Sequence, residues 1–171
     1  MSARAGETFD ADRAAAEVVD LSAAPVPDAG PTTAEGAPAT GEWSATTGTG
    51  FRIVPLWEGE ALTGVYGAEW TDATEAGAEQ LDALSKALET RWGPHRTIQL
   101  HGPLLRWQMS QPVAPLFEAL FKEDLYGDLH VWGPLPTNRY VATIIGHSDG
   151  DAPLILAALV TDQPITQPPG P

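Results

Sequence analysis

The chain has 171 residues, with 9 Lys and Arg against 23 Asp and Glu, which gives a formal net charge of −14. It contains no cysteine, and this excludes disulfide frameworks, thiolate zinc sites and cysteine nucleophiles. The excess of acid argues against a nucleic-acid partner, because binding to phosphates relies on Lys and Arg. No apolar run approaches the roughly 18 residues of a membrane span, and residues 1–20 lack a signal-peptide pattern. We therefore expect a cytoplasmic protein that does not engage a membrane.

The first 50 residues differ in composition from the rest. Residues 22–50 are almost all Ala, Pro, Gly, Thr and Ser, with Val26 and Trp43 as the only larger apolar side chains. Such a segment buries too little surface to offset a backbone entropy of about 1–2 kcal/mol per residue. We predict a disordered acidic arm over residues 1–50, and a disordered tail over residues 164–171, where prolines recur.

One part of the arm, residues 10–21, has a helical pattern. Its small and apolar side chains recur at helical spacing, at Ala11, Ala14, Ala15, Val18 and Leu21. An isolated helix of about 12 residues is marginal in water. Two interpretations stay open: a transient helix in the arm, or a segment that folds into the groove of a partner. Trp43 is likewise either an anchor for the arm or a contact with a partner.

Residues 51–163 are predicted to form a single domain with two helices. The first spans Ala73–Arg91, with Asp72 as its cap and Gly93-Pro94 as its end. Its buried stripe is formed by Leu81, Leu84, Leu88 and Trp92. The second helix spans Pro115–Tyr126, with proline in its first turn.

Strands are predicted for most of the remaining domain. The strongest signal is a hairpin of Arg139–His147 and Ala152–Thr161, joined through an Asp-Gly turn. Its apolar residues fall on both parities, which suggests strands covered on both faces. The order β-β-α-β-β-α-β-β-β predicts an α+β fold, an antiparallel sheet with two helices packed on one face. The other predicted strands are Phe51–Trp57, Leu62–Trp70, Thr97–His101, Leu104–Met109 and Leu129–Trp132.

Strand parity then predicts a binding surface. If Thr97–His101, Leu104–Met109 and Leu129–Trp132 are strands, their polar side chains share the sheet face without helices. This mixture of an aromatic ring, a guanidinium, amides and imidazoles suits an anionic or planar group. The alternative is an ordinary solvated sheet face, and a register slip of one residue would scatter the set. The candidate binding residues are Gln99, His101, Arg106, Gln108, His130 and Trp132.

Other motifs carry little chemistry. The chain has no Gly-x-Ser-x-Gly elbow, no Walker A loop and no spacing of histidines typical of zinc sites. His147, Asp149 and Asp151 are explained by a hairpin turn better than by a metal site. We assign no catalytic residue, metal or cofactor. The tripeptide Trp-Gly-Pro occurs at residues 92–94 and 132–134, and coincidence explains it better than a duplication.

The sequence favours a non-enzymatic module that binds a macromolecule. Its acidity favours a basic protein partner, which fits an adaptor, an assembly component or an inhibitor of a basic enzyme. The competing hypothesis is a small-ligand-binding protein or an enzyme that uses His101 or His130 as base and Arg106 to hold an anion on the same face. A homo-oligomer that buries this face is a third class.

Overall fold

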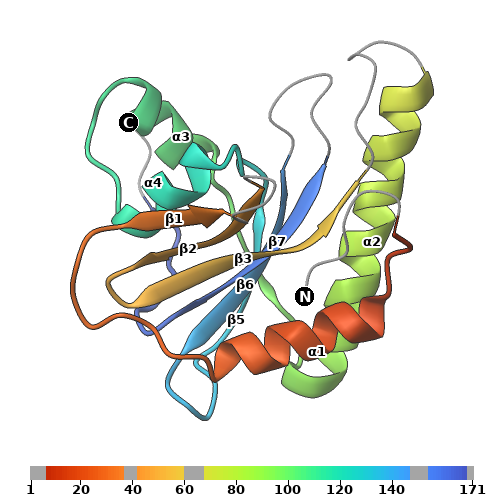
Figure 1. The fold of residues 1–171 in the computed structure, drawn as a ribbon, viewed down its shortest axis with the longest axis horizontal. Helices are drawn as coiled ribbons and strands as arrows, with labels where there is room; N and C mark the ends of the chain where they lie inside the picture. The colour runs from red at the N-terminus through yellow and green to blue at the C-terminus, as the bar shows by residue number, and fades with distance from the viewer. Residues whose placement is uncertain (1–6, 37–41, 60–67, 147–153, 169–171) are drawn as a thin grey trace.

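A seven-stranded antiparallel sheet forms the centre of the molecule. Figure 1 presents the computed structural model, which describes residues 7–36, 42–59, 68–146 and 154–168. The strand order is β1-β2-β3-β7-β6-β5-β4. The strands are β1 (Thr33–Gly36), β2 (Trp43–Gly48), β3 (Phe51–Glu58), β4 (Arg96–Ile98), β5 (Leu129–Trp132), β6 (Tyr140–Gly146) and β7 (Ile155–Thr161).

Four helices accompany the sheet in the described residues, namely α1 (Ala11–Ser22), α2 (Ala68–Trp92), α3 (His101–Gln108) and α4 (Pro115–Lys122). None of these helices is both long and apolar enough to cross a membrane. The predicted α+β class is confirmed, but the element order is α-β-β-β-α-β-α-α-β-β-β and not the predicted one.

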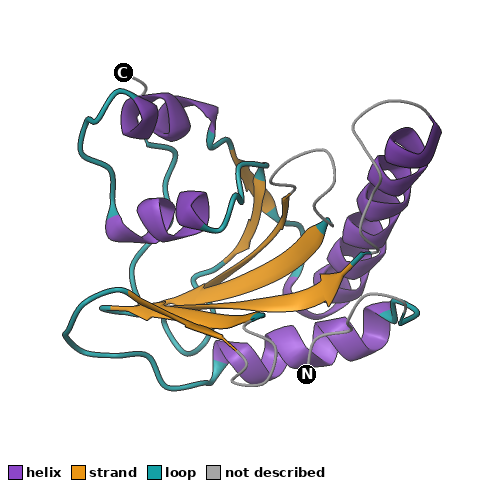
Figure 2. Ribbon diagram, turned by 45° about the horizontal axis from the view of Figure 1, so that its top comes forward, coloured by secondary structure: helices purple, strands orange, loops and turns teal. Residues whose placement is uncertain are grey.

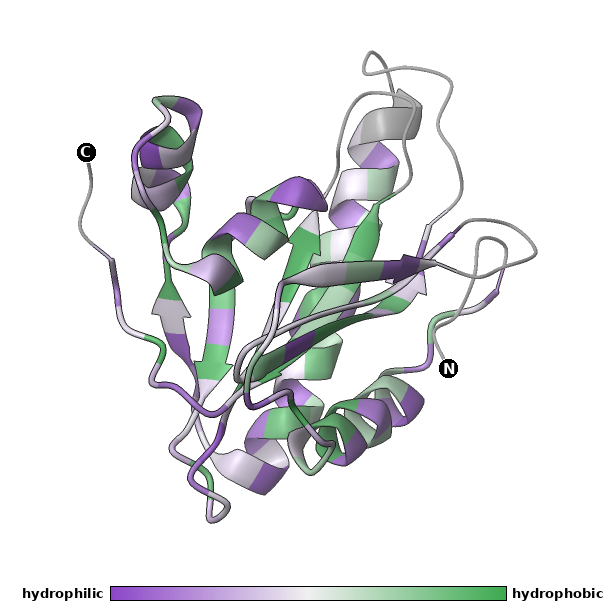
Figure 3. Ribbon diagram, turned by 60° about the vertical axis from the view of Figure 1, so that its left-hand side comes forward, coloured by the Kyte–Doolittle hydropathy of each residue, from purple (hydrophilic) through white to green (hydrophobic). Residues whose placement is uncertain are grey.

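The helices lie on both faces of the sheet, so the prediction of helices on one face is wrong. Figure 2 shows α1 and α2 on one side of the strands and α3 and α4 on the other. Ala142 and Ile144 of β6 pack in the core on the α4 side, and Val141 packs in the core on the α1 and α2 side. Each central strand therefore buries both parities. Figure 3 shows the result, with hydrophobic colour dominating the central strands and alternating along α1.

One predicted strand is largely helical, and another overlaps a helix in its described residues. The predicted strand Leu104–Met109 lies largely in α3, in which Leu104 and Trp107, three positions apart, pack against the core on the α4 side. At the predicted strand Leu62–Trp70, residues 68–70 belong to α2, and residues 62–67 lie outside the described part. Asp72 is consequently inside α2 and does not cap it.

The arm is not separate from the fold in the described residues. Asp10 caps α1 by accepting hydrogen bonds from the backbone N–H groups of Asp12 and Arg13, at 3.0 and 3.1 Å. Val18 of α1 is fully buried among residues of α2 and the sheet. The helical pattern of residues 10–21 corresponds to α1, and residues 7–36 and 42–50, which the sequence assigns to a disordered arm, contribute α1, β1 and β2 to the fold. The folded unit begins before residue 51.

Arg139 fastens the end of α1 to the start of β6. Its Nη1 donates a hydrogen bond to the Ser22 carbonyl at 3.3 Å and another to the Ala24 carbonyl. A cation at this position also offsets the partial negative charge of the helix C-terminus. The N-terminal helix is therefore held by a polar contact as well as by burial.

The tail also packs on the sheet as far as it is described. Ile165 is buried in the core on the α4 side. The Gln167 side chain exchanges two hydrogen bonds with the backbone of Gln99, both at 2.9 Å. Residues 164–168, which the sequence assigns to a disordered tail, thus contact the core and the segment after β4.

The hairpin and the end of α2 agree with the sequence. Strands β6 and β7 pair antiparallel from Tyr140 with Thr161 to Gly146 with Ile155. The predicted Asp-Gly turn between them lies in residues 147–153, outside the described part. Gly93 follows α2 with a φ of 80°, and its N–H bonds to the Glu89 carbonyl at 2.8 Å. Such a left-handed cap favours glycine.

Candidate functional site

The six predicted site residues do not share one surface. His101, Arg106 and Gln108 belong to α3, and Gln99 lies between β4 and α3. Only His130 and Trp132 lie on a strand of the sheet, β5. The shared sheet face assumed for these residues is wrong, because its middle segment is a helix and parity has no meaning there.

The Arg106 guanidinium and the Gln99 backbone form hydrogen bonds within the fold. The Arg106 guanidinium donates to the Pro112 carbonyl through Nε at 3.3 Å and Nη2 at 3.1 Å. Gln99 uses its backbone, not its side chain, to hold Gln167. Arg106 therefore stabilises the turn that follows α3.

His130 and Trp132 face α2 and not water. Trp132 is 2% exposed, its ring lies 6.3 Å from that of Trp92, and its Nε1 donates to the Gly93 carbonyl at 2.9 Å. His130 Nδ1 lies 2.8 Å from Ser85 Oγ of α2. The sheet face that the sequence left open is thus covered by a helix.

A cluster of polar side chains joins α2 to β5. The His130 ring stacks on the His95 ring with 4.1 Å between centroids and 15° between planes. His95 Nδ1 lies 2.7 Å from Glu89 Oε1, so a chain of contacts runs from Ser85 through both imidazoles to a carboxylate. We call these four residues the imidazole cluster. Sequence reasoning missed it because Ser85 and Glu89 read as ordinary helix positions one turn apart.

Electrostatics keep one imidazole of this cluster neutral. Burial, followed by the charge of His95, lowers the pKa of His130 below its ordinary value, although nearby carboxylates act in the opposite direction. A neutral imidazole beside a hydroxyl resembles a nucleophile and its base. Ser85 is only 3% exposed, however, so a substrate has no access to its Oγ in this conformation.

Metal binding gains no support in the described residues. No group of three or more His, Asp or Glu side chains there has the arrangement to hold a metal ion. His147, Asp149 and Asp151 lie outside the described part.

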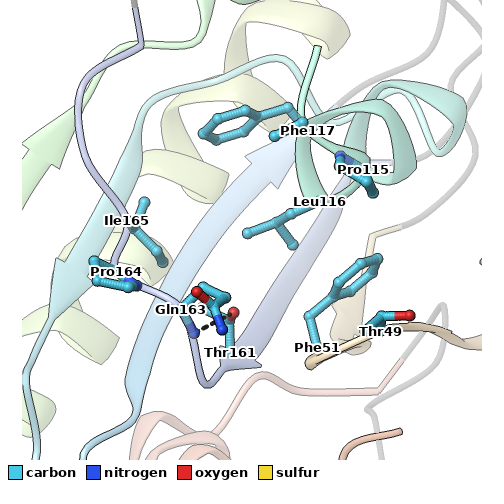
Figure 4. Close-up of a pocket in the computed structure, with 10 residues that line it drawn as sticks. Thr49, Phe51, Pro115, Leu116, Phe117, Thr161, Gln163, Pro164 and Ile165 are labelled. Carbon is cyan, nitrogen blue, oxygen red and sulfur yellow. Dashed lines mark hydrogen bonds between the residues drawn. The ribbon is translucent and has the colours of Figure 1, made fainter. Parts of the chain in front are cut away.

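An apolar pocket opens on the other side of the sheet, beside α4. Figure 4 shows side chains from three segments pointing into it: the β2–β3 turn, the first turn of α4 and the segment after β7. Its volume is about 160 Å³. The residues that line it are Thr49, Phe51, Ala114, Pro115, Leu116, Phe117, Thr161, Gln163, Pro164 and Ile165.

Local structure explains why this pocket is open and mostly apolar. Pro115 starts α4 directly at the rim, so Leu116 and Phe117 project from its first turn. The Gln163 N–H is satisfied by Thr161 Oγ1 at 3.1 Å, which removes one backbone donor from the rim. Phe51, Leu116 and Ile165 are among the apolar side chains of the lining. The sequence assigned these residues to a strand, a helix and a tail, and gave no sign that they meet.

Comparison of the chain with family models, curated proteins and solved structures gives no match in any of the three.

Proposed function

We propose that the protein is a module that binds another protein. The partner inserts one apolar side chain into the pocket beside α4. The observation that carries the proposal is an accessible pocket with a largely apolar lining, to which three separate segments contribute Phe51, Leu116 and Ile165. Concave apolar pockets that bury one anchor residue are where binding energy concentrates in protein interfaces.

The size of the pocket supports a single side chain as occupant. Sites for drug-sized ligands span about 300–1,000 Å³, whereas a cavity of about 150 Å³ holds one benzene ring. At about 160 Å³ the pocket suits one aromatic or branched aliphatic group. At the rim, Thr49 Oγ1 donates to the Gly30 carbonyl and Gln163 Nε2 donates to Asp162 Oδ1. The Thr49 oxygen and the Gln163 amide retain capacity for hydrogen bonds to the backbone on either side of that group.

Charge supports a basic partner. The net charge of −14 attracts cationic proteins over long distances and speeds their encounter. We therefore expect Lys or Arg in the partner segment that flanks the anchor. An adaptor, an assembly component and an inhibitor of a basic enzyme are all compatible with this mode of binding.

The competing hypothesis of an enzyme or ligand receptor receives less support. It needs His101 or His130 together with Arg106 on one face of the sheet. His130 lies beneath α2, on the opposite side of the sheet from α3. His101 and Arg106 both belong to α3, but at five positions apart they project from different faces of that helix. The guanidinium is moreover bonded to the Pro112 carbonyl.

The test compares two variants that add the same charge at different places. Leu116→Glu puts a carboxylate into the apolar pocket, and Met109→Glu does so at a side chain that is 60% exposed. The tagged full chain is purified from its native cell, and proteins bound in a fixed ratio are identified. We expect both variants to fold, and a partner that is lost with Leu116→Glu and kept with Met109→Glu. Leu116→Glu should melt somewhat below the parent, because Leu116 is partly buried against the core.

Two outcomes would contradict the proposal. A partner kept by both variants would place the interface elsewhere. The pocket would instead be a ligand site if the chain purified without a protein partner and bound a small molecule saturably, and if Leu116→Glu abolished that binding.

A further inference from the structure

Gly48 and Phe51 lie opposite each other at the end of the β2–β3 hairpin. Residues directly opposite on antiparallel strands project to the same face of a sheet. A Cβ on Gly48 would lie 2.4 Å from Cζ and 2.5 Å from Cε1 of Phe51, and 2.9 Å from Thr32 Oγ1. The φ of Gly48 is not positive, so the backbone itself would accept alanine. The Phe51 ring therefore occupies the space that a side chain at residue 48 would need.

The backbone of this hairpin turn is held from two sides. The Gly50 N–H donates to the Pro27 carbonyl at 2.7 Å, and the Gly50 carbonyl accepts from the Asp162 N–H at 2.9 Å. Moving the turn would break these hydrogen bonds and leave their groups unpaired. A side chain at residue 48 would therefore be accommodated by movement of the Phe51 ring and not of the backbone.

The space into which the Phe51 ring can move is the apolar pocket. Phe51 is 3% exposed and packs in the core on the α4 side, and it lines the pocket of about 160 Å³. Figure 4 shows its ring projecting from the turn toward Leu116. Because the rest of a core is close-packed, a displaced ring moves into free volume. A Cβ at residue 48 would require a retreat of about 1 Å, from 2.4 Å to the 3.4 Å of an ordinary contact, and the pocket would narrow.

The pocket that Gly48 keeps open matches an aromatic side chain. Two rings, those of Phe51 and Phe117, are among its lining groups, together with Pro115 and Pro164. A cavity of about 150 Å³ holds one benzene ring. Aromatic rings gain from pairing in addition to the area they bury, and aromatic residues are common anchors at protein interfaces. A branched aliphatic side chain would bury less surface and form no ring pair.

We propose that Gly48 determines which anchor the pocket accepts. Because Gly48 has no side chain, the Phe51 ring lies against the strand, and the space left free takes an aromatic side chain of the partner. This inference rests on the proposed function, to which it adds the chemical class of the anchor and the residue that selects it.

The experiment titrates the ¹⁵N-labelled full chain with N-acetylphenylalaninamide and, separately, with N-acetylvalinamide. The two probes carry a phenyl and an isopropyl group on the same backbone, and the N–H signals of Thr49 and Gln163 report binding at the pocket. We expect saturable shifts with both probes, and the phenyl probe should bind at least about threefold more tightly. Gly48→Ala should weaken the phenyl probe at least about fivefold and the isopropyl probe by less than about twofold.

The matched control is the double variant Gly48→Ala with Phe51→Leu. Leucine lacks the ring atoms that a Cβ at residue 48 would meet, so the double variant should recover part of the affinity for the phenyl probe that Gly48→Ala loses. A general loss of structure caused by alanine at residue 48 would not be recovered in this way.

Four outcomes would overturn the inference. They are equal affinities of the two probes for the parent chain, absence of saturation with the phenyl probe, an unchanged preference in Gly48→Ala, and unfolding of Gly48→Ala, which would mean that the Phe51 ring has no free space to enter. None of them decides the proposed function, which is judged separately by whether Leu116→Glu loses a protein partner.

Discussion

The two sides of the sheet satisfy their buried polar groups to different extents. On the side of α4, the hydroxyl of Thr46 accepts from Trp43 Nε1 at 2.9 Å, and that of Thr161 accepts from the Gln163 N–H at 3.1 Å. On the side of α1 and α2, three buried atoms lack a partner in the described residues, namely Trp57 Nε1, Gln80 Oε1 and Thr143 Oγ1.

This difference has consequences for stability. A buried polar group without a partner costs about 1–3 kcal/mol, whereas a satisfied one is close to neutral or favourable. The layer of α1 and α2 should therefore open at a lower free energy than the layer of α4. It also contains the imidazole cluster, in which burial lowers the pKa of His130, so we expect its stability to depend on pH. The α4 side instead combines a satisfied core with the open apolar pocket.

The largest expected effect comes from breaking the contact of α1 with the sheet. Val18→Asp places a charge at a fully buried position, and the variant should lose at least about 3 kcal/mol in free energy of unfolding. Ala16→Asp, on the exposed side of the same helix, should change stability by less than about 0.5 kcal/mol. Urea unfolding of both measures the difference. Equal midpoints would mean that α1 is not part of the folded unit, and the comparison of two covered faces would then fail.

The sequence predicted those elements whose pattern is local. The helix beginning after Asp10, the stop at Gly93 and the β6–β7 pairing each depend on neighbouring residues, and each is found. The hairpin also carried the signal for two covered faces, since its apolar residues have both parities. The sequence did not show that α1 helps to cover the second face. A helix as short as α1 is marginal by itself, and it is stabilised by packing on the sheet.

The predicted site failed for a related reason. Leu105, Trp107 and Met109 alternate with polar residues as a strand would, but Leu104 and Trp107 also match a helical turn, and tertiary contact decided for the helix. The imidazole cluster and the apolar pocket combine residues far apart in the chain. No spacing in one sequence can place His130 beside Ser85, or Ile165 beside Leu116.

A smaller effect would sharpen the contrast within the α2 layer. Ser85→Ala removes the partner of His130 Nδ1 and should cost about 1 kcal/mol. Thr143→Val removes a buried hydroxyl without a partner in the described residues, directly across the strand pair from His130. It keeps the shape of the side chain and should be neutral or stabilising by up to about 1 kcal/mol. Denaturant midpoints measure the change in stability of both variants. If Thr143→Val lost more stability than Ser85→Ala, the Thr143 hydroxyl would have a hydrogen-bond partner.

The smallest effect concerns pH, and its sign follows from the lowered pKa of His130. Above pH of about 6.5 the imidazole is neutral in both folded and unfolded chains, so its contribution is constant. As the pH falls below about 6.5, the unfolded chain takes up this proton first, and stability should decrease until the folded pKa is passed. The decrease should be small because His130 is only half buried. Unfolding midpoints at pH 7.5 and 5.5 measure it, and NMR titration of the His130 ring measures the pKa directly. His130→Gln should reduce the difference between the two midpoints, whereas His101→Gln, on α3 across the sheet, should leave it in place. A midpoint difference that His130→Gln leaves unchanged would remove the imidazole cluster as the pH-sensitive element of the α2 layer.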